Sequence, residues 1–572
     1  MIAVRIIALL AAGAVLHAAG AAAPAPRERR VARSWMRSMT LRDKAAQLVI
    51  AEFRGSVPNA RSKAYREYLS LVRDLKVGGF ALVNRSEPYA LAAFLNRMQR
   101  ASKVPLLVGG DFERAVSMRV ESATLFPHAM AFAAAGSPEL SRLEGEITAR
   151  QARALGVPWI FAPVADVNNN PDNPIINIRS YGESPEVVAA HVRAFIEGAR
   201  AAGPVLVTVK HFPGHGDTAT DSHMELPVLD VTKERLENLE LLPFRAAIEA
   251  GVDAVMSAHI AVPALDKDPA TLSPALLTGV LQKELGFDGL IVTDALNMRG
   301  ITNTWPAGEA AVRALEAGVD VLLIPDDPKA AVDGIVAAVR KGRLSEARLN
   351  HSVEKLLAAK VRVGLDRERI TDPEALEDAL DTPEDVEAAQ RVADQAVTLV
   401  KNDNDLLPLR EPAGTCFVVL AESRTTQAGR LFAAEVAKRA PAATVITLDP
   451  QAPQAELDAA VEKAGSASTI VVAAFVSVAS YRGSVALAGA YPKLMEALID
   501  TDKPVALIAL GSPYLARSFP RVAAYLTTYS TVPTSEAAAV KALFGEMPIQ
   551  GRLPVTIPGF AKYGDGIQLP AK

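Results

Sequence analysis

The sequence of 572 residues predicts an α/β protein, in which a (β/α)8 TIM-like barrel is followed by a second, smaller open α/β sandwich domain. Three observations support this prediction. The chain is long enough for two or three domains. Short apolar segments rich in β-formers alternate with amphipathic helical segments through most of its length. A helical stretch over 371–401 separates a first set of eight apolar segments from a second set.

The first set of apolar segments predicts the barrel, over 34–370. Amphipathic helical segments lie between its members, at 63–75, 185–201, 233–250, 273–285 and 307–317. Continuous apolar strands that alternate with helices indicate a parallel sheet covered by those helices. Eight such units in this length indicate a closed barrel. The predicted strands are 47–53, 78–84, 105–113, 159–167, 206–210, 254–260, 289–295 and 320–325.

The second set predicts the sandwich domain, over 402–572, joined to the barrel by the helical linker at 371–401. Its predicted helices include 427–439 and 454–464. Strands that alternate with helices again indicate a layered α/β sheet. None of these strands is followed by a glycine-rich phosphate-binding loop. The predicted strands are 416–421, 444–448, 469–475, 504–510, 523–528 and 553–557.

The N-terminus predicts a secretory signal peptide at 1–25. Arg5 precedes the uncharged apolar stretch 6–23, and Ala21, Ala23 and Ala25 suit cleavage after small residues. We therefore expect export to the periplasm or to the outside of the cell. An uncleaved anchor helix is the alternative, although the apolar stretch is near the lower length limit for a membrane span.

Composition narrows the possible partners and chemistry. The net charge is −4 and no run of Lys or Arg dominates, which argues against a nucleic-acid partner or binding to acidic lipids. Cys416 is the single cysteine, so no disulfide within the chain is possible. It lies in an apolar predicted strand without His or Asp nearby in sequence, which indicates a core residue.

Polar side chains follow five of the predicted barrel strands. Active sites of such barrels lie at the carboxyl ends of the strands, so we expect these side chains to meet on one face. This convergence is stronger evidence for a site than any single motif. The residues are Asp111, Arg119, Asp166, Lys210, His211, His259 and Asp294.

The segment 210–223, Lys-His-Phe-Pro-Gly-His-Gly-Asp-Thr-Ala-Thr-Asp-Ser-His, carries three of the eight histidines. It begins where the apolar segment 206–209 ends, which is typical of a buried strand that opens into a loop. Within it, Asp221 stands two residues before His223. A histidine exchanges protons near neutral pH, and a neighbouring carboxylate orients the ring and supports its charged form. The alternative is a pair of solvated loop residues.

Asp294 follows the apolar segment 289–293. A carboxylate at the mouth of a dry barrel is costly unless a task or a partner holds it there. One such task is nucleophilic attack on an anomeric carbon, which forms a covalent glycosyl-enzyme intermediate. The alternatives are a cap for the next helix or an ion pair with an arginine.

These residues match a known family. The segments 210–217 and 221–223 closely resemble the signature of glycoside hydrolase family 3, in its β-N-acetylglucosaminidase branch, and 293–298 resembles the nucleophile segment of that branch. The resemblance covers nearly all of the chain that follows the predicted signal peptide. Further similar stretches lie at 35–47, 126–127, 177–181, 399–403, 406–409, 511–514 and 551–558.

The resemblance implies a retaining exo-glycosidase that releases terminal β-linked N-acetylglucosamine from cell-wall or chitin-type oligosaccharides through a glycosyl-aspartate intermediate. Asp294 is then the nucleophile, His223 the acid/base and Asp221 its partner. No metal or other cofactor is implied; the partner is the carbohydrate, and the chain is a monomer or a homodimer. The implied ligands of the terminal sugar are Asp111, Arg119, Arg179, Lys210 and His211.

The chain departs from the branch after Asp111. It reads Phe-Glu-Arg-Ala-Val-Ser-Met-Arg119, where the branch commonly has Glu-Gly-Gly-Arg-Val in the interior. The aspartate and the arginine are kept, but the loop between them differs, so the resemblance does not fix the sugar preference.

Three alternatives change the chemistry. The first is a metal-dependent barrel hydrolase, whose ligands would be His211, His215, Asp217, His259 and Asp294. The His-x-x-x-His spacing favours metal binding only on a helix, and Pro213, Gly214 and Gly216 prevent a helix there. A phosphorylase would use phosphate as the acceptor, and a histidine repels phosphate less than a carboxylate does. An inactive sugar-binding module is the third, and the joint presence of Asp294, Asp221 and His223 argues against it.

Overall fold

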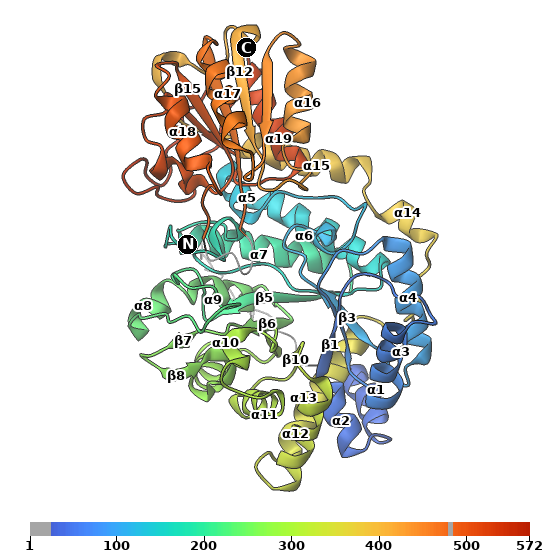
Figure 1. Ribbon diagram of the computed structural model, residues 1–572. Coiled ribbons are helices and arrows are strands. Elements are labelled where there is room, and N and C mark those ends of the chain that lie inside the picture. The colour runs from blue at the N-terminus through green and yellow to red at the C-terminus, as the bar shows by residue number, and fades with distance from the viewer. Residues whose placement is uncertain (1–23, 479–483) are drawn as a thin grey trace, which may run out of the picture.

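The computed structural model describes residues 24–478 and 484–572, so nearly all of the predicted signal peptide at 1–25 lies outside the described residues. Two domains are stacked (Figure 1). The second domain sits on the side of the first where α5 (Ala129–Ala135), α6 (Pro138–Ala154) and α7 (Pro185–Ala201) lie. In the described parts of the chain, no helix combines the length and the apolar character needed to cross a membrane.

The first domain is the predicted eight-stranded parallel barrel. Its order is β10-β1-β2-β3-β4-β5-β6-β9, and each neighbouring pair is parallel. Val321, just before β10, donates its N–H to the carbonyl of Ile291 in β9 at 3.1 Å, which brings the two ends of the sheet together. The strands are β1 (Val49–Phe53), β2 (Gly79–Leu82), β3 (Leu107–Gly110), β4 (Trp159–Ile160), β5 (Leu206–Phe212), β6 (Ala254–Ser257), β9 (Leu290–Thr293) and β10 (Leu322–Leu323).

The barrel strands are short, apolar and buried. Every residue of β2, β3, β5, β6 and β9 is buried, because the strands face the barrel interior on one side and the surrounding helices on the other. The helices that follow the strands include α3 (Lys63–Ser70), α4 (Pro88–Ala101), α6, α7, α9 (Leu242–Glu249), η5 (Ala275–Glu284), α11 (Ala307–Ala317) and α12 (Pro328–Arg340). All eight predicted strand segments contain the observed strand or overlap it.

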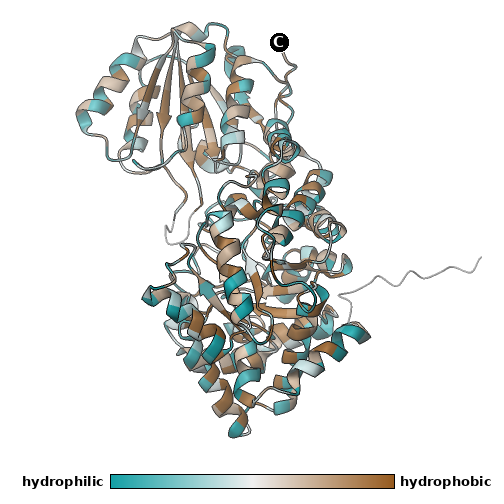
Figure 2. Cartoon of the chain, turned by 90° about the vertical axis from the view of Figure 1, so that its right-hand side faces the viewer, coloured by the Kyte–Doolittle hydropathy of each residue, from teal (hydrophilic) through white to brown (hydrophobic). Residues whose placement is uncertain are grey.

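The second domain is a six-stranded sheet in the order β11-β16-β15-β14-β12-β13, with β11 antiparallel and the other strands parallel. Figure 2 shows its apolar strands between helices whose polar residues face outward. Cys416 on β12 is fully buried, as a core residue should be. The strands are β11 (Thr398–Asn402), β12 (Thr415–Leu420), β13 (Thr444–Leu448), β14 (Thr469–Val476), β15 (Val505–Gly511) and β16 (Ala524–Thr527), and the helices include α16 (Arg430–Arg439), α17 (Gln454–Gly465), α18 (Tyr491–Ile499) and α19 (Pro533–Phe544).

Two elements of this domain differ from the prediction. The sixth strand is β11, which lies in the segment expected to be the helical linker; α14 (Ala375–Ala379) and α15 (Pro383–Ala396) precede it. The segment 553–557 is not a strand. Pro554 has no N–H for a ladder, and its carbonyl accepts from the N–H of Glu183 in the barrel at 3.0 Å. This segment belongs to the contact between the domains.

Three residues of the barrel loops, His128, Asn168 and Glu183, make side-chain hydrogen bonds to the second domain. Nδ1 of His128 lies 2.8 Å from Oγ of Ser530, and Nδ2 of Asn168 donates to the hydroxyl of Tyr514 at 2.9 Å. The carboxylate of Glu183 accepts from both the N–H and the hydroxyl of Thr556, each at 2.7 Å. These contacts hold the second domain beside the mouth of the barrel.

Candidate active site

A cavity of about 310 Å³ opens at the carboxyl ends of the barrel strands. Asp111 follows β3, Lys210 and His211 end β5, and Asp294 follows β9, so three separate strands deliver charged groups to it. One wall residue, Val478, comes from the second domain, two residues after β14. The cavity is lined by Asp111, Glu113, Arg114, Met118, Arg119, His128, Ile175, Arg179, Lys210, His211, His215, Ser222, His223, Asp294 and Val478.

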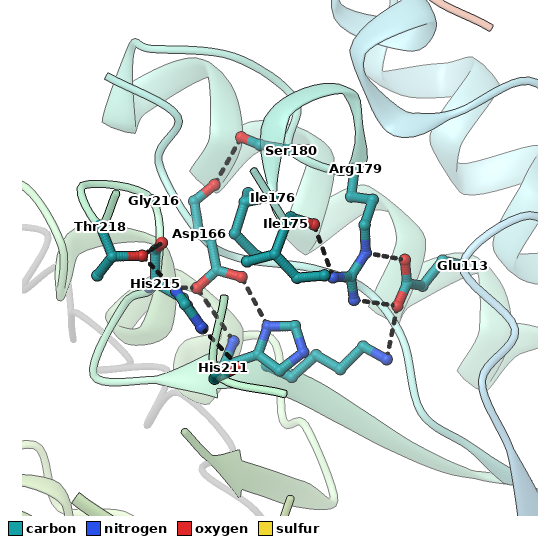
Figure 3. Close-up of polar contacts among 12 residues, drawn as sticks. Glu113, Asp166, Ile175, Ile176, Arg179, Ser180, His211, His215, Gly216 and Thr218 are labelled. Carbon is teal, nitrogen blue, oxygen red and sulfur yellow. Dashed lines mark hydrogen bonds and ion pairs between the residues drawn. The ribbon is translucent and has the colours of Figure 1, made fainter. Parts of the chain in front are cut away.

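Five charged side chains form one ion-pair network on this wall. Nζ of Lys210, whose side chain is 1% exposed, lies 2.8 Å from Oδ1 of Asp111 and 2.7 Å from Oε1 of Glu113. Arg119 donates to the other oxygen of Asp111 at 2.6 Å. Figure 3 shows the guanidinium of Arg179 against the carboxylate of Glu113, joined by two hydrogen bonds of 2.7 and 2.8 Å.

The network keeps its members charged. Burial alone would raise the pKa values of Asp111 and Glu113, but the charges of Lys210, Arg119 and Arg179 hold both well below their usual range. Burial would lower the pKa of Lys210, and the two carboxylates raise it instead. The result is a rigid set of charge-assisted donors and acceptors, suited to the hydroxyl groups of a sugar.

His211 is held by Asp166 behind the cavity wall. Oδ2 of Asp166 lies 2.7 Å from Nδ1 of His211, and Oδ1 accepts the backbone N–H of His211 at 3.2 Å and of His215 at 2.7 Å (Figure 3). Asp166 is fully buried, and its carbonyl accepts from the hydroxyl of Ser180 at 2.6 Å. Because Nδ1 is engaged, Nε2 is the ring nitrogen available to a ligand.

The loop after β5 brings Asp221 and His223 into contact. Oδ1 of Asp221 lies 2.8 Å from Nδ1 of His223 and accepts the backbone N–H of His223 at 2.9 Å. The Asp221 side chain is 1% exposed, whereas that of His223 is 23% exposed and lines the cavity. The carboxylate therefore fixes the ring from the protein side and leaves its outer edge toward the cavity.

The surroundings of Asp294 keep its carboxylate ionised. Burial raises its pKa, but the neighbouring rings of His211, His259 and His223 and the backbone N–H of Ala295 lower it below the usual value. That N–H donates to Oδ1 at 2.7 Å. His259 supports the same turn, since its Nε2 lies 2.9 Å from the carbonyl oxygen of Ala295.

The structure brings the predicted site residues together. Asp111, Arg119, Arg179, Lys210, His211, His223 and Asp294 all line the cavity, and Asp221 stands directly behind His223. Sequence reasoning left out Glu113, although it lies two positions after Asp111 in the same loop. It also left out Val478, for which the sequence carries no signal because this residue belongs to the other domain.

Three of the five residues considered as metal ligands are engaged elsewhere. Both ring nitrogens of His215 have hydroxyl partners, Thr218 at 2.7 Å and Ser222 at 3.1 Å. Both nitrogens of His259 are likewise occupied, and Asp217 pairs with Arg235 at 2.8 Å. Within 24–478 and 484–572 no group of three or more candidate ligands converges. The geometry gives no support to the metal-dependent alternative.

Buried histidines predict a loss of stability in mild acid. Burial lowers the pKa values of His191 and His215 from 6.5 to about 4. Between pH 6.5 and about pH 4 the unfolded chain therefore binds more protons at these histidines than the folded chain does. Their contribution to the free energy of unfolding is complete above pH 6.5 and falls as the pH drops toward 4. Each histidine contributes on the order of 3 kcal/mol. Buried carboxyl groups with raised pKa values, such as Glu144, act in the opposite direction over the same range, so the measurement compares the Tm of the wild type with that of a histidine variant from pH 7.5 to 4.

His191→Gln supplies the control for this prediction. His191 is 1% exposed, stacks on Tyr181 and lies 2.8 Å from the hydroxyl of Ser141, so the variant removes the titrating group and keeps a polar side chain there. Its Tm should fall less steeply than that of the wild type. The same dependence of Tm on pH in the wild type and in His191→Gln would contradict the argument. Asp111 and Glu113, whose pKa values are lowered, add a further loss only below about pH 4.

Comparison with known protein families gives two matches along the chain. Residues 40–359 match the glycosyl hydrolase family 3 N terminal domain, and residues 397–568 match the glycosyl hydrolase family 3 C-terminal domain. A β-N-acetylglucosaminidase/β-glucosidase of Cellulomonas fimi is 30% identical over 512 residues, which cover 86% of this chain and 90% of the relative. β-Hexosaminidase A of Pseudoalteromonas piscicida is 29% identical over 554 residues, covering 86% and 91%.

Solved structures agree with these matches. A glycoside hydrolase family 3 β-N-acetylglucosaminidase from Paenibacillus sp. str. FPU-7 superimposes with a TM-score of 0.82 at 34% identity, covering 91% of this chain and 99% of that one. A β-glucoside phosphorylase superimposes with a TM-score of 0.83 at 25% identity, covering 93% and 97%. These findings confirm the predicted fold and the predicted class of glycosidase. With matches in both of its domains, this chain belongs to glycosyl hydrolase family 3.

Proposed function

We propose that this protein is a retaining exo-glycosidase that releases terminal β-linked N-acetylglucosamine, with Asp294 as nucleophile and His223 as acid/base. One observation carries the proposal: His223 and the ionised Asp294 line the same cavity, and the buried carboxylate of Asp221 lies directly behind the ring of His223. Retaining glycosidases need these two roles: an ionised carboxylate and a separate proton donor. The names of the relatives from Cellulomonas fimi and Pseudoalteromonas piscicida support the choice of sugar.

The reaction proceeds in two displacements. A carboxylate oxygen of Asp294 attacks the anomeric carbon while protonated His223 gives its proton to the departing glycosidic oxygen, so the C–O bond breaks and a glycosyl-aspartate forms. His223, now neutral, takes a proton from water, whose oxygen attacks the same carbon and releases Asp294. Two inversions return the β configuration. Asp221 supports the charged ring in the first step and keeps its orientation in the second.

The ion-pair network supplies the binding site for the terminal sugar. Asp111, Arg119, Arg179, Lys210 and His211 present fixed donors and acceptors on one wall. Hydrogen bonds to charged groups that are already in place cost little reorganisation on binding. We assign Glu113 to this set as the residue that positions Arg179 and Lys210.

The N-terminal sequence extends the proposal to location and substrate source. Residues 1–25 have the pattern of a secretory signal peptide, so we propose export and action on cell-wall or chitin-type oligosaccharides outside the cytoplasm. Cell fractionation with the complete gene product tests this point. Recovery of a chain that keeps residues 1–25 in the cytoplasmic fraction would contradict it.

Phosphorolysis is the second candidate. The excess of cationic groups in the cavity and the similarity to a solved β-glucoside phosphorylase favour it. In that case phosphate replaces water as the acceptor in the second displacement. The product is then a glycosyl phosphate.

The first experiment measures 4-nitrophenol release from the β-N-acetylglucosaminide and the β-glucoside, with and without inorganic phosphate and a chelator. We expect turnover of the N-acetylglucosaminide that a chelator does not change, with the β-anomer of the free sugar as the first product in proton NMR. A first product with the α configuration would contradict the retaining mechanism. A glycosyl phosphate would move the assignment to a phosphorylase, and failure to cleave either glycoside would reject the proposed function.

A further inference from the structure

Arg114 differs from the other cationic side chains that line the cavity. Arg119, Arg179 and Lys210 each pair with Asp111 or Glu113 at 2.8 Å or less. For the Arg114 guanidinium, no hydrogen bond or ion pair is found among the residues that the structure describes. It lines the cavity and is only partly exposed.

The backbone beside Arg114 is strained. Ala115 has φ 57° and ψ −172°, a region that side chains rarely adopt. This is the loop that departs from the glycine-rich sequence of the similar branch, and here it carries a long cationic side chain instead. Non-glycine residues in such conformations are energetically costly and cluster at functional sites. The strain therefore accompanies the placement of Arg114 in the cavity wall.

Basic side chains outnumber carboxylates on the cavity lining, and the buried carboxyl of Glu144 also lies within electrostatic reach of Arg114. Among the described residues, four basic side chains and three carboxylates line the cavity, an excess of one before the histidines are counted. Burial lowers the pKa of Arg114 to about 10, with Glu113 opposing and the charges of Arg119, Arg85 and Arg179 adding to the lowering. A cation among other cations in a low-dielectric site is costly, and an incoming anion relieves that cost.

Arg114 lies near His128, on the part of the cavity wall that contacts the second domain. The groups that act on the pKa of Asp294 are the rings of His211, His259 and His223. Arg114 instead acts on His128, which reaches Ser530 of the second domain. An anion at Arg114 therefore lies near the wall shared with the second domain.

We infer that Arg114 is a specificity-determining residue that binds an oxyanion, a carboxylate carried by the glycan itself. A guanidinium matches a carboxylate with two parallel hydrogen bonds, and Arg114 is the cavity arginine whose donors are not committed to protein carboxylates. This inference rests on the proposed glycosidase function. It adds that acidic oligosaccharides are preferred to neutral ones of the same size.

The test compares two matched substrates with the full-length enzyme. The acid is β-1,4-linked N-acetylglucosaminyl-N-acetylmuramic acid, whose second sugar carries a lactyl carboxylate, and the neutral partner is its methyl ester. In the wild type, kcat/KM for the acid should exceed that for the ester by about 10- to 100-fold, the range for a hydrogen-bonded charged group. Arg114→Gln should bring this ratio close to one, and Arg114→Lys should keep part of it.

Arg85→Gln is the control. Arg85 is an exposed neighbour that acts on Arg114 but does not line the cavity, so the variant removes the same charge nearby and should keep the wild-type ratio. An acid-to-ester ratio of kcat/KM that is unchanged in Arg114→Gln overturns the inference, as does a wild-type preference for the ester. In either case, cleavage of the disaccharides still upholds the proposed function. No cleavage of either disaccharide or of the 4-nitrophenyl glycoside overturns both.

Inorganic phosphate is the other source of an oxyanion, and a separate arm tests it. If phosphate accelerates turnover of the neutral ester, yields a glycosyl phosphate and loses this effect in Arg114→Gln, then Arg114 binds the acceptor. That outcome overturns its assignment to the glycan. A phosphate-independent rate, together with the acid-to-ester ratio, supports it.

Discussion

Asp294→Asn is expected to lower kcat for the 4-nitrophenyl β-N-acetylglucosaminide by on the order of 10⁴-fold while the fold is retained. The amide cannot form the glycosyl-enzyme bond, so the first displacement loses its nucleophile. Oδ1 of asparagine still accepts the N–H of Ala295, which in the wild type lies 2.7 Å from Oδ1 of Asp294. A steady-state assay together with the Tm separates loss of chemistry from loss of structure.

A second variant identifies the missing step. In Asp294→Gly, azide should enter the space of the carboxylate and attack the anomeric carbon directly, which gives an α-glycosyl azide by a single inversion. Asp217→Asn is the matched control, since Asp217 lies outside the cavity lining and pairs with Arg235. This control should keep near wild-type turnover. More than a tenth of the wild-type kcat in Asp294→Asn would show that the nucleophile is another group.

His223→Gln is expected to lower kcat/KM for N,N′-diacetylchitobiose by about 10²- to 10⁴-fold, the usual contribution of a general acid. The effect should be much smaller for the 4-nitrophenyl glycoside, because 4-nitrophenolate departs without being protonated. Asp221→Asn should act in the same direction, since the buried carboxylate lies 2.8 Å from Nδ1 of the ring and supports its charged form. Rates for both leaving groups in each variant provide the measurement.

The double variant Asp221→Asn/His223→Gln tests whether the two residues form one unit. If the aspartate acts through the histidine, the double variant should be no slower than His223→Gln alone. A loss equal to the product of the two single losses would mean independent roles. Equal losses for the disaccharide and the aryl glycoside would show that His223 does not protonate the leaving oxygen.

Much of the fold could be predicted because buried parallel strands leave a clear pattern. Segments such as 206–210 and 254–260 are continuous and apolar, and polar residues appear where each strand ends. β11 escaped prediction because Lys401 and Asn402 make it look unlike a buried strand, and it lies at the edge of the sheet, where it pairs antiparallel with β16. The segment 553–557 has a strand-like composition, but Pro554 and Thr556 contact Glu183 in the barrel instead.

The candidate site could be predicted only in part. Asp111, Lys210 and Asp294 were predictable because strand ends of a barrel converge on one face. The role of Glu113 depends on its distances to Arg179 and Lys210. The distinction of Arg114 depends on its guanidinium having no hydrogen bond or ion pair among the described residues, and a single sequence expresses neither feature. Val478 required the packing of the two domains.

The loop after β4 links the cavity wall to the second domain. It carries Asp166, which holds His211, then Arg179, which binds Glu113, and then Glu183, which anchors Thr556 of the second domain. A sugar that tightens the first two contacts also restrains the third, because all lie on one short stretch of backbone. Linkage then requires the reverse: whatever loosens the docking of the second domain weakens the affinity for the sugar by the same free energy.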